Sequence, residues 1–256
     1  MQPYIFPYIG YFQMISAVDK FVFYDDVNYI KGGWINRNRI LINNLPQYFT
    51  IPLIKASPNR LINEIEFDAS NKDYSKLTHK IQQAYAKAPY FKEVFPIIKD
   101  ILNHKTTYIS ELAIYSVITI CRYLDIDTKF FVSSKDFNES KGLDRADRLI
   151  DICKKENCDT YINAIGGQEL YTKEYFSENG IKLFFIESEK VTYKQFGDEF
   201  CPWLSIIDVL MFNEKEEIKQ RKDLSNNSAK IKNENNPAQD KEEYSRLQSF
   251  RPKWRR

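Results

Sequence analysis

The chain has 256 residues, of which 43% are hydrophobic and 28% charged, so it can bury a sizeable core in one large domain or two small ones. A net charge of only +2 argues against the global basic field of many nucleic-acid-binding proteins, and we expect no DNA partner. Four cysteines without a CxxC pair, together with two histidines, argue against a zinc site of ordinary spacing, and no metal site is predicted.

The sequence shows no signal for export or for membrane insertion. No stretch resembles a signal peptide, and no uninterrupted apolar run reaches about 18 residues. We therefore expect a cytoplasmic protein whose cysteines are reduced thiols.

The first third of the chain is predicted to begin with a loop and to continue mainly as strands. A loop rich in proline and tyrosine leads into a short helix at 11–18, and a strand at 21–26 ends in two acids. Two strands at 34–43 and 47–54 flank the turn residues NNLP, which predicts a hairpin. The stretch EIEFDAS (64–70) is expected to form another strand.

Helical patterning follows. Apolar residues recur at three- and four-residue spacing in the segments 76–88, 91–104 and 109–124. The proline at position 89 separates the first helix from the second. We interpret this region as a helical insertion at about 73–126.

The pattern then alternates between strand and helix. Strands are predicted at 129–134, 160–167 and 181–188, with helices at 145–157 and 170–180 between them and a last short helix at 205–212. Strands that alternate with helices favour a parallel sheet with right-handed crossovers. The predicted fold class is α/β: a Rossmann-like, mostly parallel sheet with a helical insertion, forming one domain over residues 1–212.

The segment 213–256 has a different composition. It carries a charge of +4 against −2 for residues 1–212, and it has few aliphatic residues. We expect a charged, disordered tail. Its last six residues, RPKWRR, would make a weak contact with a membrane or a partner, or would simply be solvated.

The opening loop, the helix and the strand after it are typical of half a nucleotide-binding βαβ unit. Gly10 would let a ligand approach the backbone closely, and the first amides of the helix would favour an anion. Tyr8 and Tyr11 would offer hydroxyl groups or stack on a base or a sugar. The alternative is a structural aromatic corner that packs under the sheet.

Acidic and basic residues follow the first strand. Asp25 and Asp26 would bind a metal ion or a hydroxyl group, or one of them would act as a general base; the alternative is strand-end capping and solvent exposure. Lys31 and Arg37 would hold phosphate or carboxylate. Because strand residues alternate between two faces, only one of the pairs Asn36/Asn38 and Arg37/Arg39 can face a pocket, and we favour Arg37 together with Asp26.

The remaining candidates lie further along the chain. His79 would act as a general base, although a lone helical histidine is often structural. Ser133 and Ser134, at a strand end, would hold phosphate or sugar or would cap a helix, and Gly166–Gly167 would form an anion nest. The candidates are, as catalytic groups, Asp26 and His79 and, for substrate binding, Tyr8, Gly10, Tyr11, Gln13, Asp25, Lys31, Asn36, Arg37, Asn38, Tyr85, Ser133, Ser134, Asn163, Gly166 and Gly167.

Several uncommon motifs resemble one family. QPYIFPYIGYFQMISAVDKFVFYDDVNYIKGGWINRNRI, HKIQQAYAKAPYF, YINAIGGQELY and FCPWLSIIDVL occur in the order found in the WbqC-like protein family, and the resemblance spans about residues 1–212. Members usually carry a few residues before the Gln-Pro pair, which form a first strand. The resemblance therefore implies either a shortened first strand or a start further upstream.

The resemblance also implies a biological setting. The family is linked to gene clusters for O-antigen and other surface polysaccharides, and some members are labelled putative amino-acid transferases. We therefore expect a transferase that moves an acyl or aminoacyl group to an amino sugar carried on a nucleotide. The activated donor would be aminoacyl-tRNA, acyl-CoA or an adenylate made from ATP. The alternative is a non-catalytic module that binds a sugar nucleotide or a glycan.

A fold-level analogy concerns the nucleotidyltransferases and pantothenate synthetases, which carry a His-x-Gly-His tetrad after the first strand. The corresponding tetrad here is Tyr8-Ile9-Gly10-Tyr11, and tyrosine cannot supply a cation. In such a relative the positive charge would come from Lys31, Arg37 and Arg39, or the phosphate chemistry would be lost.

Overall fold

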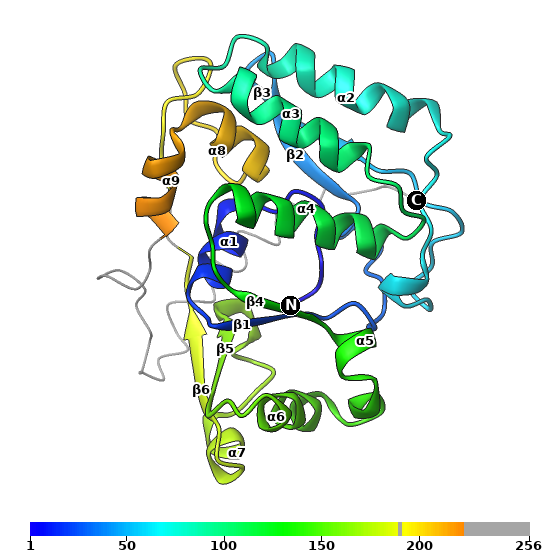
Figure 1. Cartoon of the computed structure of the whole chain (residues 1–256), viewed down its shortest axis with the longest axis vertical. Coiled ribbons are helices and arrows are strands. Elements are labelled where there is room, and N and C mark those ends of the chain that lie inside the picture. The colour runs from blue at the N-terminus through cyan, green and yellow to red at the C-terminus, as the bar shows by residue number, and fades with distance from the viewer. Residues whose placement is uncertain (189–190, 223–256) are drawn as a thin grey trace. The chain divides into compact units, whose positions relative to one another are not determined.

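The computed structural model describes residues 1–188 and 191–222 (Figure 1). Within these residues the chain forms two compact units, one made of residues 1–139 with 188–222 and the other of residues 140–187. The two units are described separately.

The first unit is built around two short parallel strands. β1 (Lys20–Phe23) and β4 (Lys129–Val132) pair in register, with Phe23 opposite Val132. The opening residue also lies beside β1, because the Met1 amine donates to the Val22 carbonyl and the Met1 carbonyl accepts from the Tyr24 amide. This pairing lies where the family resemblance implied a first strand. α1 (Ile9–Ser16) precedes β1 and is buried over all but its last residue.

A hairpin forms the second sheet of this unit. β2 (Arg37–Ile42) and β3 (Leu45–Thr50) are antiparallel and are joined by Asn43 and Asn44. Both turn residues have positive φ, 51° and 61°, as a type I′ turn requires, and asparagine tolerates that conformation. The hairpin prediction and its turn are confirmed.

Three helices follow the hairpin, as predicted. They are α2 (Lys72–Tyr85), α3 (Phe91–Leu102) and α4 (Ile109–Tyr123), and the Asn71 side chain caps α2 by accepting from the Asp73 amide at 2.8 Å. The strand expected at 64–70 is wrong. The short 3-10 helix η1 (Ile62–Glu64) ends where that strand would begin, and Glu66 and Phe67 make only isolated bridges, to Tyr108 and Leu53.

The first unit closes with two further helices. α8 (Ile206–Phe212) agrees with the predicted last helix, and α9 (Lys215–Lys222) follows it. Asp125 accepts from Lys215 at 2.9 Å and from Lys219 at 2.5 Å. The prediction of a disordered tail therefore fails over 215–222, where ion pairs and the buried Ile218 fix a helix. The rest of the predicted tail lies outside the described residues.

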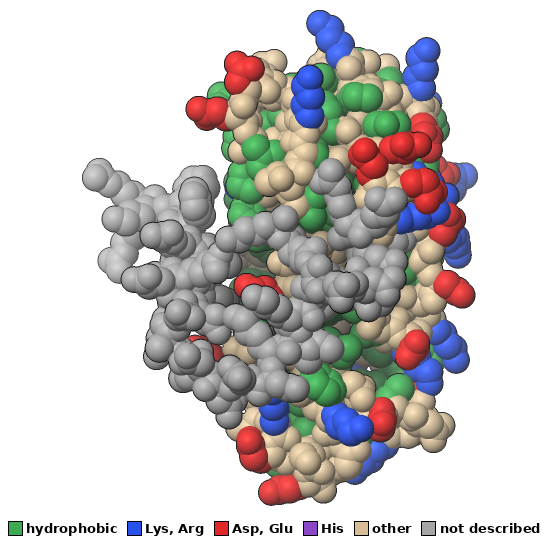
Figure 2. Space-filling model, turned by 90° about the vertical axis from the view of Figure 1, so that its left-hand side faces the viewer, with side chains coloured by type: hydrophobic (Ala, Val, Ile, Leu, Met, Phe, Trp, Pro, Cys, Tyr) green, Lys and Arg blue, Asp and Glu red, His purple; other side chains and the backbone are tan. Residues whose placement is uncertain are grey.

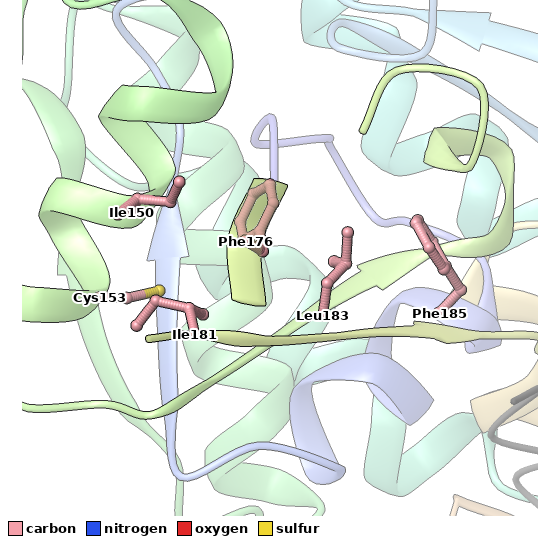
Figure 3. Close-up of a cluster of buried hydrophobic side chains, with 6 residues drawn as sticks. All are labelled: Ile150, Cys153, Phe176, Ile181, Leu183 and Phe185. Atoms are coloured by element: carbon pink, nitrogen blue, oxygen red, sulfur yellow. The ribbon is translucent and has the colours of Figure 1, made fainter. Parts of the chain in front are cut away.

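The second unit is a small βαβ arrangement. β5 (Thr160–Ala164) pairs in parallel with β6 (Lys182–Ile186), and α7 (Lys173–Glu178) lies in the connection between them. α6 (Arg145–Lys155) precedes β5, and the 3-10 helix η3 (Ile165–Gly167) follows it. Figure 3 shows the core of the unit, formed by Ile150, Cys153, Phe176, Ile181, Leu183 and Phe185.

The two parallel pairs agree with an α/β fold with mixed helices and short parallel sheets. In the described residues β1 and β4 form one two-stranded sheet and β5 and β6 another, and no strand joins the two. The single Rossmann-like sheet stays a prediction. Of the helices in the described ranges, none has the length and apolar character needed to cross a bilayer.

Candidate functional site

Two acids and two serines meet where β1 and β4 end. Asp25 and Asp26 follow β1, and Ser133 and Ser134 follow β4 as the first residues of α5 (Ser133–Asp136). Since the two strands are parallel and in register, the residues after them lie at the same edge. The structure thus brings together four candidates that the sequence offers separately. We call them the Asp–Ser cluster.

Hydrogen bonds fix Asp25 on several sides. Its Oδ1 accepts from the Ser134 amide at 3.0 Å, and its Oδ2 accepts from the Ser134 hydroxyl at 2.8 Å. Its own amide donates to Ser133 Oγ at 3.2 Å. Asp25, which follows β1, therefore caps the start of α5, which follows the neighbouring strand β4. This makes Asp25 a structural support of the cluster.

Asp26 shares one hydroxyl with Asp25. Ser133 Oγ lies 3.1 Å from Asp25 Oδ1 and also contacts Asp26 Oδ1. A hydroxyl has one proton, so Ser133 can donate to only one of these carboxylates at a time. Both acids are nearly buried, with 3% and 5% of their surfaces exposed. The cluster thus places two buried carboxylates around one serine hydroxyl.

The opening tyrosines have different environments. The Tyr8 hydroxyl lies 3.2 Å from Ser188 Oγ, and the Tyr8 ring packs edge-on to Trp203 with centroids 6.0 Å apart. Tyr11 is buried among aromatic rings, including Tyr4 and Phe21, and donates to the Gln2 carbonyl at 2.9 Å. Burial raises the pKa of Tyr11 well above its ordinary value. Tyr11 is thus part of the core, as the aromatic-corner alternative held.

Gly10 is buried against another part of the chain. A Cβ on Gly10 would lie 2.4 Å from both Ser188 Oγ and a Tyr8 ring carbon. The side chains of Ser188 and Tyr8 are therefore the groups that approach the Gly10 backbone closely. Gln13, further along α1, is also fully buried.

The two faces of β2 separate the asparagines from the arginines. Asn36, just before the strand, and Asn38 within it are buried and bind backbone: Asn36 Nδ2 donates to the Ile51 carbonyl at 2.8 Å, and Asn38 Nδ2 to the Phe6 carbonyl at 2.7 Å. Arg37 lies on the other face, and its Nε donates to the Gly33 carbonyl at 3.0 Å. Its guanidinium is thus bound to the loop before β2, and the structure does not pair it with Asp26. Lys31 is exposed.

The candidates on α2 lie on different sides of the helix. Leu77, Ile81 and Tyr85 form the buried stripe, at four-residue spacing, whereas His79 falls between them on the opposite face and is exposed. The structure therefore does not bring His79 into the Asp–Ser cluster. Tyr85 is fully buried and donates to Asp208 Oδ1 at 2.8 Å, which makes it a core residue.

The candidates of the second unit form a local turn. Asn163 Oδ1 accepts from the Ala164 amide at 2.8 Å, and a Cβ on Gly167 would lie 2.4 Å from Asn163 Nδ2. Gly166 is exposed in the same short helix, η3. Gly167 is required because the Asn163 side chain packs on its backbone.

Sequence reasoning missed a buried polar network around Asp208. Its Oδ2 accepts from the Tyr193 hydroxyl at 2.7 Å and from Gln195 Nε2 at 2.6 Å, and its Oδ1 accepts from Tyr85. Burial raises the pKa of Asp208 above its ordinary value, although these three hydrogen bonds oppose the shift. The available signal was a lone acid in the apolar run SIIDVLMF.

Two further features of the structure bear on ligand chemistry. In the part of the chain that the structure describes, no group of three or more His, Cys, Asp or Glu side chains is placed to hold a metal ion. An open surface pocket lies among Phe67, Tyr74, Leu102 and the loop 103–107, and its lining includes none of the sequence candidates.

Comparisons with known proteins give the chain a family. The model of the WbqC-like protein family matches residues 2–220. An uncharacterized protein of Mycobacterium tuberculosis, Rv1507c, is 30% identical over 211 residues, which cover 81% of this chain and 89% of that protein. No solved structure matches the chain. The match extends over both units and into α9, so the chain belongs to the WbqC-like protein family.

Proposed function

We propose that this protein is a transferase that moves an acyl or aminoacyl group onto an amino sugar carried on a nucleotide, in the synthesis of a surface polysaccharide. The observation that carries the proposal is the Asp–Ser cluster: two nearly buried carboxylates that share the Ser133 hydroxyl at the adjoining ends of two parallel strands. Ligands of α/β folds bind at this end of the strands, which supports a reaction centre there.

In the proposed reaction Asp26 is the general base. It accepts a proton from the attacking amino group of the sugar, whose nitrogen then forms a bond to the carbonyl carbon of the activated donor. The bond from that carbon to the oxygen or sulfur of the leaving group breaks, and the leaving group departs with the electron pair and takes up a proton. Ser133 positions Asp26 by donating to it, while Asp25 holds the start of α5 in place.

The first experiment compares Asp26→Asn with Asp127→Asn, an exposed acid just before β4, at the opposite end of that strand. Both variants are given UDP- and dTDP-linked amino sugars with each donor in turn: aminoacyl-tRNA, acyl-CoA, or amino acid plus ATP. Product formation is followed by mass spectrometry. Loss of a general base should lower kcat of Asp26→Asn about 10²- to 10⁴-fold, while the Kd for the sugar nucleotide stays within about threefold.

Two outcomes would contradict this role. If Asp26→Asn turns over at the wild-type rate, Asp26 is not the base. If no donor gives product but the sugar nucleotide still raises the melting temperature, the protein is the non-catalytic binding module instead.

A further inference from the structure

One face of the hairpin gathers exposed aromatic and cationic side chains. We define the aromatic–arginine face as Trp34, Arg37, Arg39, Tyr48 and Trp203. Arg39 and Tyr48 are directly opposite each other on β2 and β3, and Arg37 shares their face because side chains alternate along a strand. The face therefore follows from the register of the hairpin.

The rings and guanidinium groups on this face contact one another in a row. Trp34 stacks on Tyr48, with centroids 6.0 Å apart and an angle of 27° between the rings. Arg37 Cζ lies 4.9 Å from the centre of the Tyr48 ring, and Arg39 Cζ lies 5.8 Å from that of Trp34. The order along the row is Arg37, Tyr48, Trp34 and Arg39, so a stacked pair of rings lies between two positive charges.

Packing within the unit covers these rings only in part. Trp34 is 40% exposed, and Tyr48 and Trp203 are each 41% exposed. Trp203 also has a φ of 61°, a left-handed conformation that is uncommon and strained for a bulky residue. A large ring that is held in this conformation and left exposed points to a binding role.

The backbone holds both guanidinium groups in place. Arg37 donates to the carbonyls of Gly32 and Gly33, and Arg39 Nη2 donates to the Trp203 carbonyl at 3.0 Å. A guanidinium has five N–H donors, and these bonds use two in Arg37 and one in Arg39 within the described ranges. Each arginine is therefore preorganised, and because Arg39 Nε is buried, the N–H groups left for an anion are those of the Nη atoms.

The segment that carries four of the five side chains of this face is basic, whereas the exposed acids Asp198 and Glu199 precede Trp203. Residues 27–63 contain five Lys and Arg and no Asp or Glu, although residues 1–212 as a whole carry −2. Figure 2 shows both signs interspersed on the side of the molecule in view. The small net charge of the chain thus conceals a local block of positive charge, which favours an anionic occupant.

The openness of the face decides between anionic occupants. A small ligand prefers a concave site that covers most of its surface, whereas exposed rings flanked by cations are the arrangement that binds a flexible polyanion with flat bases. We propose that the aromatic–arginine face binds single-stranded nucleic acid, with phosphates on Arg37 and Arg39 and bases on the rings.

This inference goes beyond the proposed function and does not need it. In a transferase of the kind proposed above, the face would hold the single-stranded end of an RNA donor. This extension rests on the proposed function. Aminoacyl-tRNA would then be the donor among the three considered.

The test is fluorescence anisotropy of a labelled 12-nucleotide oligo(U), titrated with the full chain across a salt series. Arg37→Gln/Arg39→Gln should weaken binding at least tenfold and reduce the slope of log K against log salt by about 1.4, which is two contacts at about 0.7 each. Trp34→Ala should weaken binding roughly 5- to 150-fold through lost stacking. The matched control is Lys92→Gln/Lys99→Gln, two exposed lysines on α3 with the same change in net charge.

Three results would overturn the inference: no binding by the wild type, an equal loss in the control, or retained oligonucleotide binding in the arginine variant. If that variant instead lost binding to phosphatidylserine vesicles alone, the face would be a lipid-binding surface. Oligonucleotide binding is measured without donor or acceptor, and Asp26→Asn should leave it unchanged. Failure of this inference is therefore distinguishable from failure of the proposed transferase.

Discussion

At the scale of single residues, the most constrained side chain is the Asp208 carboxylate. It is fully buried in α8 and accepts three hydrogen bonds, from Tyr85, Tyr193 and Gln195. Tyr85 also accepts from the Leu41 amide at 3.0 Å, so the network ties α2 and α8 to β2. Such networks stabilise one arrangement of a core as long as every member is satisfied.

The raised pKa of Asp208 predicts a pH dependence of stability. Because burial makes the folded state hold this proton more tightly than the unfolded chain, where the pKa is about 3.9, the wild type gains stability from Asp208 below pH 3.9. That contribution is lost as the pH rises through the higher folded pKa. We expect the unfolding free energy of the wild type, relative to Asp208→Asn, to fall as the pH rises from 3.5.

Urea unfolding of both proteins at steps between pH 3.5 and 7 measures this difference. A difference in unfolding free energy that stays flat or grows with pH would contradict a raised pKa of Asp208. Asp208→Ala serves as a reference, because a buried donor left without its acceptor costs about 1–3 kcal/mol at any pH.

The sequence predicted the Asp–Ser cluster better than it predicted the rest of the candidate site. Residues that follow parallel strands must meet at one edge, so Asp25, Asp26, Ser133 and Ser134 could be found from pattern alone. Tyrosine has an apolar body with a polar tip, and it is equally suited to a pocket wall and to a core. Burial of Tyr11 and Tyr85 therefore depended on packing that the pattern does not contain. The orientation of His79, by contrast, follows from the spacing of Leu77 and Ile81.

At the scale of elements, the hairpin shows how local chemistry sets a functional surface. The two-residue turn fixes the register, and the register places Arg39 opposite Tyr48. A slip by one residue would bring the asparagines of β2 to the outside and the arginines into the core. The aromatic–arginine face therefore depends on Asn43 and Asn44.

The turn offers a direct test. Asn44 has a φ of 61°, a conformation that glycine adopts without steric cost, whereas alanine pays roughly 1–2 kcal/mol. We expect Asn44→Gly to preserve or raise the melting temperature and Asn44→Ala to lower the unfolding free energy by about 1 kcal/mol. Thermal melts of both variants measure this. Equal stability of the two would contradict the left-handed turn.

Helices and strands were predictable where an apolar pattern repeats over several turns. They were less predictable where contacts with distant parts of the chain determine the secondary structure. Helices α2, α3 and α4 each carry three or more turns of apolar spacing and appear where the sequence placed them. The false strand at 64–70 has strand-forming residues but makes only isolated bridges. α9 was missed because its stability comes from Asp125, far away in the sequence.

At the scale of the whole molecule, the second unit has a core of its own. Phe176 is fully buried there and stacks on Tyr161, with centroids 5.6 Å apart. A unit of this size with two strands buries little surface, so its stability depends on a few side chains.

Phe176→Ala should therefore act on one unit. Loss of a buried phenylalanine costs about 3–5 kcal/mol, which is enough to expose β5 and β6 to hydrogen exchange. We expect faster exchange in 140–187 and unchanged protection in α4 of the first unit. Hydrogen–deuterium exchange followed by mass spectrometry measures both regions, and an equal loss of protection in each would show that the two units unfold as one.

The division into units also explains where fold prediction stopped. Alternating strands and helices predict parallel pairs, and both pairs exist, each with its partner in register. Strands and helices alternate along the sequence in the same way whether the two parallel pairs form one sheet or two. The pattern therefore could not predict that β4 and β5 belong to separate sheets.

The outer edge of β3 has a consequence for behaviour at high concentration. In a two-residue hairpin the pair next to the turn exchanges hydrogen bonds, so Pro46 and Tyr48 direct their backbone groups away from β2. Pro46 has no N–H to offer, and the Tyr48 carbonyl already accepts from Lys80 Nζ at 3.1 Å. A second copy of the chain that approached this edge would lack the Pro46 N–H and would compete with Lys80 for the Tyr48 carbonyl, so the edge is a poor template for intermolecular strand addition and the aggregation that follows from it.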